Sequence, residues 1–371
     1  MLTTALQLLL VLAFPALALW GERRSKIVAT ISPVILCYSA GMLLGNLPRV
    51  SLNKDLATTT CEILVALAIP LLLFSVDLGA WARLAGRTVL SFVLVMVAAV
   101  GGSMGAWALV GRGLDYGPEM AGMLTGVYTG GTPNMAAIGT GLGVPTETFV
   151  LLNAADMVAS IPCLFLILLV APRVLARLLP PFRRGDGEIA EPMVLFRSLP
   201  RPAAAGTALL LTAAVVGAGV GLGAFLPAGG RSAGIILAIT TLAVGLSAVP
   251  LVRNLKGTHD LGQYLLLAFC ISIGTVTNFS EVFSSNPVIV LFAVLTIVFS
   301  VVIHFALAVL FRIDRDTAII TSAAGIFGPH MIGPVAANLK NREVVFSGIA
   351  SGLVGFAAGN YLGMGVAWLL S

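Results

Sequence analysis

The chain alternates long apolar runs with short polar connectors. A membrane-spanning helix needs about 20 predominantly apolar residues, and the chain contains a series of runs of about this length. They occupy residues 2–20, 27–48, 56–76, 88–111, 148–172, 203–230, 232–252, 261–280, 282–311 and 344–371. The pattern predicts an all-α polytopic membrane protein with about 10 transmembrane helices, the first of which keeps its N-terminus outside.

One connector, residues 177–202, is longer and more polar than the others and contains Pro180 and Pro181. Such a stretch is typical of a linker between two structural units. We therefore expect a first half at residues 1–176 and a second half at residues 203–371, joined on the cytoplasmic side by this linker.

Two further neutral segments, residues 118–146 and 315–340, are interrupted by glycine and proline. The first contains TGGTPNMAAIG from Thr129, and the second contains GIFGPHMIGPVA from Gly325. In lipid, each unsatisfied backbone group costs roughly 2–7 kcal/mol, so such breaks must be buried in protein or face water. Broken helices that point their ends at a solute are a feature of transporters, whereas a simple kink that eases helix packing is the alternative.

The residues at the two breaks are therefore candidate substrate contacts, because helix N-termini favour negative charge. These candidates are Thr129, Gly130, Gly131, Thr132, Pro133 and Asn134 at the first break, and Gly328, Pro329 and His330 at the second. If the two breaks face each other, Asn134 and His330 are expected to meet near the centre of the bilayer.

Each interrupted segment could cross the membrane or form a re-entrant hairpin, and the basic residues discriminate between these arrangements. Two hairpins place 17 of the 21 Lys and Arg residues on one side, whereas two crossings give a split of 13 to 8. The hairpin arrangement leaves five spans in each half, so the second half is inverted relative to the first. A shift of 196 residues aligns Thr125 with Thr321 and Pro133 with Pro329, which favours a repeat.

Asp156 lies about eight residues into an apolar run, with Asn153 three residues earlier on the same helix face. A carboxylate at this depth is costly and is a functional candidate by default. Carboxylate and amide oxygens suit Na⁺, and a lone buried carboxylate suits a proton, so we expect Asn153 and Asp156 to serve ion coupling, with Asp156 as the Na⁺ ligand. A structural Asp that bonds a neighbouring helix is the alternative. In the last span, glycines around Asn360 indicate a close helix contact.

Composition excludes several classes of protein. The chain is 58% hydrophobic and 10% charged, and its net charge of +5 comes from connectors, so nucleic acid is not an expected partner. The four cysteines lie in apolar runs, and no motif of a soluble enzyme or of an ATP-driven pump is present. We therefore expect a protein that is not an enzyme and has no cofactor, with Na⁺ or H⁺ as coupling ion and the lipid bilayer and a small solute as partners.

The GGTPN-type first break, the second break with Gly328 and Pro329, and the ten-span layout resemble the YjcL-like family of uncharacterised bacterial membrane proteins. That family is similar in plan to the glutamate:sodium symporters and to the bile-acid symporter and cation:proton antiporter superfamily. The resemblance implies a mobile core domain that moves against a panel domain, a bacterial inner-membrane location and a possible homodimer. The antiporters' adjacent Asn-Asp pair is absent, since Ala154 and Ala155 separate Asn153 from Asp156.

Together these features favour a secondary active transporter that couples Na⁺ or H⁺ to the symport of a small organic anion by alternating access. A cation:proton antiporter without an organic solute is the first alternative. A membrane scaffold or sensor that keeps a transporter fold is the second. Both ends of the chain are expected outside the cell.

Overall fold

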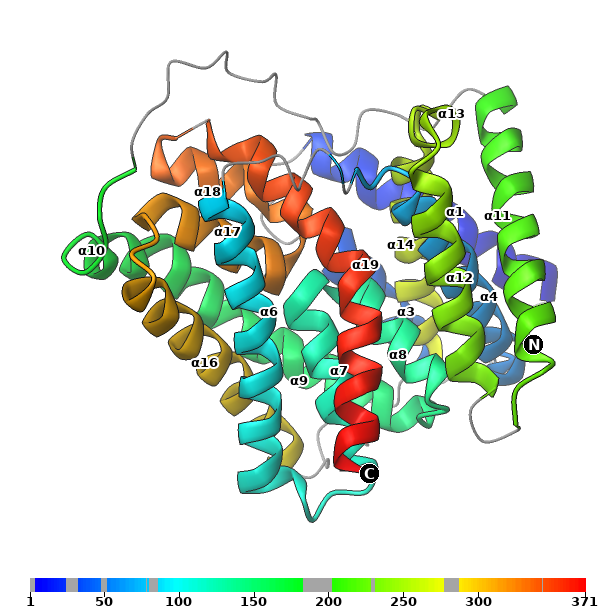
Figure 1. The fold of residues 1–371 in the computed structure, drawn as a ribbon. Coiled ribbons are helices and arrows are strands. Elements are labelled where there is room, and N and C mark those ends of the chain that lie inside the picture. The colour runs from blue at the N-terminus through cyan, green and yellow to red at the C-terminus, as the bar shows by residue number, and fades with distance from the viewer. Residues whose placement is uncertain are drawn as a thin grey trace.

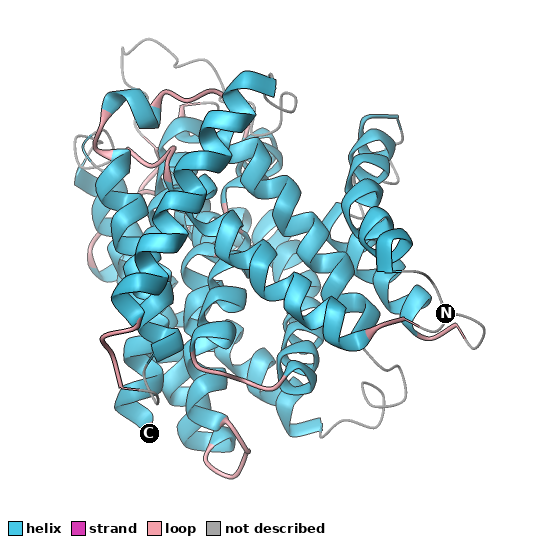
Figure 2. Ribbon diagram, turned by 90° about the vertical axis from the view of Figure 1, so that its right-hand side faces the viewer, coloured by secondary structure: helices cyan, strands magenta, loops and turns pink. Residues whose placement is uncertain are grey.

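The computed structural model describes residues 4–24, 33–47, 52–77, 79, 86–182, 202–227, 231–276, 287–341 and 343–371. Within this part the secondary structure is helical, with loops and turns between the helices (Figures 1 and 2). The helices of the first half are α1 (Thr4–Arg24), α3 (Pro33–Gly45), α4 (Lys54–Leu73), α6 (Gly86–Ala106), α7 (Gly117–Gly130), α8 (Thr132–Gly141), α9 (Thr146–Phe165) and α10 (Ala171–Leu175). Those of the second half are α11 (Pro202–Gly223), α12 (Arg231–Ser247), α13 (Pro250–Arg253), α14 (Thr258–Val276), α16 (Pro287–Leu310), α17 (Arg315–Phe327), α18 (Ile332–Leu339) and α19 (Val344–Leu370).

Eight of the described helices are long and apolar enough to cross a membrane, and two shorter apolar helices lie within α3 and α12. Each predicted span overlaps one of these helices. Short π-helical turns continue α6 through residues Trp107–Gly111 and α9 through residues Leu166–Val170. The prediction of an all-α polytopic membrane protein is confirmed. Most of the predicted linker lies outside the described residues.

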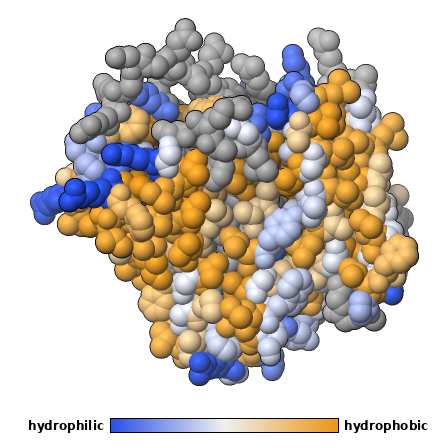
Figure 3. Space-filling view, in the orientation of Figure 1, coloured by the Kyte–Doolittle hydropathy of each residue, from blue (hydrophilic) through white to orange (hydrophobic). Residues whose placement is uncertain are grey.

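The outer surface explains why these helices need a bilayer. Large apolar side chains point outward from α11, where Leu210 is 75% exposed, and from the turn after it, where Phe225 is 87% exposed. Apolar side chains cover most of the face drawn in Figure 3. A soluble protein rarely exposes patches of this kind, whereas lipid is their natural solvent.

The helices form two groups. In the panel group, α4 packs along α14, α3 and α1 pack on α14, and α11 and α12 pack on each other and on α4. In the core group, α6 packs along α16, α7 along α19, α9 on α16, and α17 on α6, α7 and α19, with α8 and α18 completing it. Figure 1 shows α4, α11 and α12 on one side of the molecule and α6, α16 and α17 on the other.

Helices at equivalent positions of the two halves pair with each other. α4 and α14 are the third predicted spans of their halves, and α6 and α16 are the fourth. Small residues permit the close approach: a Cβ on Gly102 of α6 would lie 2.4 Å from the Ser300 hydroxyl of α16. Such pairing is what an inverted repeat would produce, although the repeat boundaries stay a prediction.

Candidate functional site

The first interrupted segment is a helical hairpin, hairpin 1, in which α8 folds back along α7. Gly131 separates the two helices with φ 103° and ψ −173°, a conformation that strains any residue with a side chain. Pro133 then opens α8 at a position where its missing N–H costs nothing. Contacts between the two helices show that α8 runs back beside α7. A Cβ on Gly126 would touch Ile138, and one on Gly139 would touch Met123.

The second interrupted segment, hairpin 2, has the same design. Gly328 ends α17 with φ 77° and ψ −178°, and Pro329 opens a 3₁₀ turn, Pro329–Met331, that leads into α18. The two ends of the hairpin are tied together, because the Asn341 side-chain amide donates to Asp316 Oδ2 over 2.9 Å. Both segments are therefore hairpins in the structure, the arrangement that the basic residues favoured.

The tips of the two hairpins touch. A Cβ placed on Gly131 would lie 3.9 Å from both the Cα and the backbone nitrogen of Gly328. Gly328 and Pro329 are buried, and Thr132 is half-buried. Two helix C-termini and two helix starts thus converge on one spot inside the protein, where backbone carbonyl and N–H groups are free of regular helical pairing.

α19 holds the two hairpins end to end through a line of glycines. In order along this helix, a Cβ on Gly348 would touch Ile320 and Ile332 of hairpin 2, and one on Gly352 would touch Pro329. One on Gly355 would lie 2.1 Å from the Thr129 carbonyl oxygen of hairpin 1, and glycines 359 and 363 continue along its arms. Because α19 is long enough to span the bilayer, the hairpins enter from opposite sides. The close contact expected around Asn360 is confirmed.

Polar side chains at the first break mainly secure the backbone. The Asn134 side-chain amide donates to the Gly355 carbonyl over 2.8 Å and to the Gly126 carbonyl over 3.3 Å, which fastens the tip to α19. The Thr129 hydroxyl donates to the Thr125 carbonyl within α7. The His330 side chain lies outside the described residues, so the expected meeting with Asn134 stays a prediction.

Asp156 lies on α9, 6% exposed, beside hairpin 1. The Ser160 hydroxyl donates to its Oδ1 over 3.1 Å, and the Tyr128 side chain lies close to the same carboxylate. Tyr128 is fully buried three residues before Gly131, and its hydroxyl also lies 3.5 Å from the Ala293 carbonyl of α16. Asn153 is also buried on α9. Sequence reasoning missed Tyr128, because no local pattern indicates that a tyrosine in α7 faces a carboxylate 28 residues further on.

A second buried polar cluster joins hairpin 2 to α6 and α16. Ser91 Oγ lies 2.7 Å from Thr321 Oγ1 and 3.4 Å from His304 Nε2, and His304 Nδ1 lies 2.6 Å from Ser322 Oγ. Thr125 of hairpin 1, the residue that the 196-residue shift aligns with Thr321, likewise meets a serine of α6: its Oγ1 lies 2.5 Å from that of Ser103. The alignment was the signal that could have identified these threonines.

We expect Ser91→Ala to destabilise the protein, because it removes a hydroxyl that joins His304 to Thr321 in a fully buried place. Loss of a buried partner costs about 1–3 kcal/mol. Thermal unfolding in detergent measures this, with Thr58→Ala as control, since the exposed Thr58 hydroxyl bonds only within its own helix. Equal melting of both variants would contradict the importance of the cluster.

The described residues contain no group of three or more His, Cys, Asp and Glu side chains that could hold a metal ion. The chemistry available near the tips is therefore that of one carboxylate with hydroxyl and carbonyl oxygens. Such a set suits a proton or a monovalent cation better than a transition metal.

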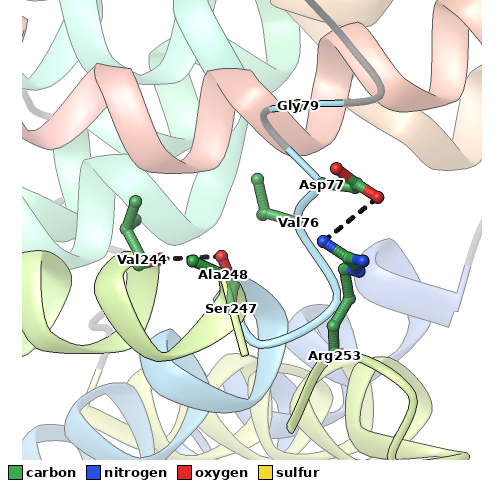
Figure 4. Close-up of a pocket in the computed structure, with 7 residues that line it drawn as sticks. All are labelled: Val76, Asp77, Gly79, Val244, Ser247, Ala248 and Arg253. Atoms are coloured by element: carbon green, nitrogen blue, oxygen red, sulfur yellow. Dashed lines mark hydrogen bonds and ion pairs between the residues drawn. The ribbon is translucent and has the colours of Figure 1, made fainter. Parts of the chain in front are cut away.

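A cavity of about 280 Å³ lies in the panel group, where α4 and α12 end. It is lined by Val76, Asp77, Gly79, Val244, Ser247, Ala248 and Arg253 (Figure 4). Arg253 and Asp77 form an ion pair of 3.2 Å at its edge, with each side chain about 30% exposed. Both α4 and α12 also contact α8 and α19 of the core group.

Comparison with known proteins agrees with the features described above. A family model described as "Protein of unknown function (DUF819)" matches residues 9–371. The uncharacterized membrane protein YjcL of Bacillus subtilis (strain 168) is 25% identical over 367 residues, which cover 94% of this chain and 92% of that protein. The resemblance inferred from the two breaks is confirmed. The chain is a multi-pass membrane protein that belongs to the DUF819 family.

Proposed function

We propose that the protein is a secondary active transporter that moves a small organic anion with Na⁺ or H⁺ by alternating access. The observation that carries this proposal is the contact between the tips of two hairpins that enter from opposite sides. Such tips offer a solute backbone N–H and carbonyl groups inside the membrane, where water cannot satisfy them. A membrane protein can fold stably without two interrupted helices that meet at their tips, so this contact favours a binding role.

The helix starts at Thr132 and Pro329 are the groups that would attract a negatively charged solute. Gly131 and Gly328 add no side chain where the tips meet, whereas Gly130 packs against Gly355 of α19 and would hold the first tip in place. The Thr129 and Asn134 side chains donate hydrogen bonds to backbone carbonyls and would therefore stabilise the conformation of this site. His330 would add a donor from the second tip.

Asp156 would couple the ion to the site through Tyr128. A phenol carries one proton, so Tyr128 can donate to the Asp156 carboxylate or to the Ala293 carbonyl, but not to both. Binding of an ion at Asp156 would change this choice and thereby the last turn of α7, directly before the tip of hairpin 1. Asn153 would supply a further oxygen from the same helix.

A cation:proton antiporter is the second candidate. It is favoured by the surroundings of Asp156, where the Ser160 hydroxyl donates to the carboxylate and the Tyr128 side chain lies close by. Such a carboxylate could bind Na⁺ and H⁺ in turn without any organic solute. The protein would then release protons when Na⁺ is added to a weakly buffered sample.

A thermal-shift screen of purified protein against Na⁺, K⁺ and pH, crossed with organic acids, tests these functions. A ligand that binds only the folded state adds about 2.7 kcal/mol at one hundred times its Kd. Symport predicts an organic acid that stabilises only together with Na⁺ or at low pH. Stabilisation by Na⁺ or pH alone would favour the antiporter, and no response to any ligand would favour a scaffold or sensor and contradict transport.

A further inference from the structure

The interface between the two groups is closed on one side. Near the open end of hairpin 1, a Cβ on Gly141 of α8 would lie 3.3 Å from Ala233 Cα of α12 and 2.5 Å from Met364 Cε of α19. Further along α12, the Asn360 side-chain amide donates to Thr240 Oγ1 over 3.0 Å, and the Thr241 and Tyr361 hydroxyls lie 2.7 Å apart. These contacts pack α12 against α19 on the hairpin 1 side.

The cavity lies at the other end of α12. Val244, Ser247 and Ala248, at the far end of α12, line the cavity together with residues after α4. α19 runs antiparallel to α12 along this face, so this end of α12 lies toward the half of α19 that contacts hairpin 2. The cavity therefore lies on the side where the sequence places most basic residues, the side expected to be cytoplasmic.

The lining of the cavity carries one charge of each sign. Val76, Val244 and Ala248 are apolar. The Ser247 hydroxyl donates a hydrogen bond to the Val244 carbonyl. Arg253 Nη1 lies 3.2 Å from Asp77 Oδ2, and a guanidinium carries five N–H groups, more than this contact uses. Because a partly exposed ion pair contributes little to stability, a ligand with both charges can replace it.

We propose that this cavity binds small amino acids on the hairpin 2 side, with Arg253 taking the carboxylate and Asp77 the ammonium group. A forked guanidinium matches a carboxylate in two parallel hydrogen bonds. A zwitterion leaves the net charge of the cavity unchanged, whereas a simple anion would face Asp77. The volume of about 280 Å³, just below the usual range for ligand pockets of roughly 300–1,000 Å³, suits a solute of this size.

This inference rests on the proposed transport function, and it assigns the solute to the zwitterionic amino acids, whose carboxylate supplies the negative group that the hairpin tips would attract. The experiment attaches an impermeant maleimide to Ala248→Cys in membrane vesicles of either orientation. The four native cysteines are buried, so the unsubstituted chain supplies the background. We expect labelling from the hairpin 2 side only, and we expect L-alanine to slow it while propionate and ethylamine at the same concentration do not.

Three variants on this background assign the charges. Arg253→Gln and Asp77→Asn should each weaken protection by alanine by about tenfold or more, the effect of losing a charge-assisted hydrogen bond. Lys256→Gln, which removes an exposed positive charge nearby, should leave protection unchanged. Labelling from the opposite side would overturn the assignment of the open side.

Two other results would overturn the ligand assignment. If propionate slowed labelling of Ala248→Cys, and still did so in the Asp77→Asn variant, the cavity would recognise the carboxylate alone. Absence of protection, in a protein that organic acids still stabilise in the thermal screen, would leave transport standing and remove this cavity as the binding place. If no solute stabilised the protein in that screen either, the proposed function would fall together with the inference.

Discussion

Gly355→Ala is expected to prevent normal folding of a large share of the protein. The new Cβ would lie 2.1 Å from the Thr129 carbonyl oxygen and 3.1 Å from Gly130 Cα. Both neighbours are backbone atoms at the tip of hairpin 1, so neither can rotate away as a side chain could. Overpacking usually costs about 1–3 kcal/mol, and a clash with a fixed backbone lies at or beyond the upper end of this range.

The matched control is Gly365→Ala in the same helix. A Cβ on Gly365 meets nothing within 4 Å, so this substitution should gain the better helix propensity of alanine, about 1 kcal/mol. Size-exclusion chromatography of a fluorescent fusion in detergent, followed by thermal inactivation, measures both variants. If Gly355→Ala and Gly365→Ala gave equal yield and melting temperature, the tip of hairpin 1 could not lie against α19 as described.

Asp156→Asn is expected to abolish the effect of the coupling ion while the protein stays folded. Asparagine has almost the same shape and can still accept a hydrogen bond from Ser160, so packing around α9 should change little. The carboxylate that a proton or Na⁺ would bind is gone. Melting temperature with and without Na⁺, and across pH, is the measurement, and the variant should lose the dependence that the wild type has.

Ser160→Ala and Tyr128→Phe separate the carboxylate from its partners. Each removes one hydroxyl beside Asp156 and leaves the charge, so each should weaken the ion effect without abolishing it. A hydrogen bond to a charged group contributes about 1.5–3 kcal/mol. Full retention of Na⁺ and pH dependence by Asp156→Asn would remove this residue from the mechanism, whichever transport mode applies.

The spans and the hairpins were accessible from the sequence because both follow from one-dimensional constraints. A bilayer fixes the length of each apolar run, and Gly131 with Pro133 cannot sit inside a regular helix. The distribution of basic residues then favoured hairpins over crossing helices, and the contact between Asp316 and Asn341 agrees with that choice. These features need no knowledge of which helices touch.

The surroundings of each polar side chain were not accessible in this way. Asp156 stood out because a membrane carboxylate is costly, yet its partner Tyr128 resembles any other aromatic residue in an apolar helix. His304 lies inside an apolar run with no local sign of its partner, and the structure places its Nδ1 2.6 Å from Ser322 Oγ of hairpin 2. Such contacts join residues far apart in the chain, and only the packing of α6, α7, α9, α16 and α17 brings them together.

The cavity at the ends of α4 and α12 also required the structure. Arg253 is one of many basic residues in connectors, and no sequence pattern indicates that its Nη1 lies 3.2 Å from Asp77 Oδ2. α4 and α12 also contact α8 and α19 of the core group.

The most direct test of transport is concentrative uptake into proteoliposomes, with the organic acid that gives the largest stabilisation in the thermal screen. An imposed Na⁺ or proton gradient should drive accumulation above the outside concentration, and collapse of the gradient should release the solute. Asp156→Asn should stay folded but fail to concentrate the solute. Accumulation by Asp156→Asn equal to that of the wild type, or no uptake under any gradient, would contradict ion-coupled transport through the meeting hairpins.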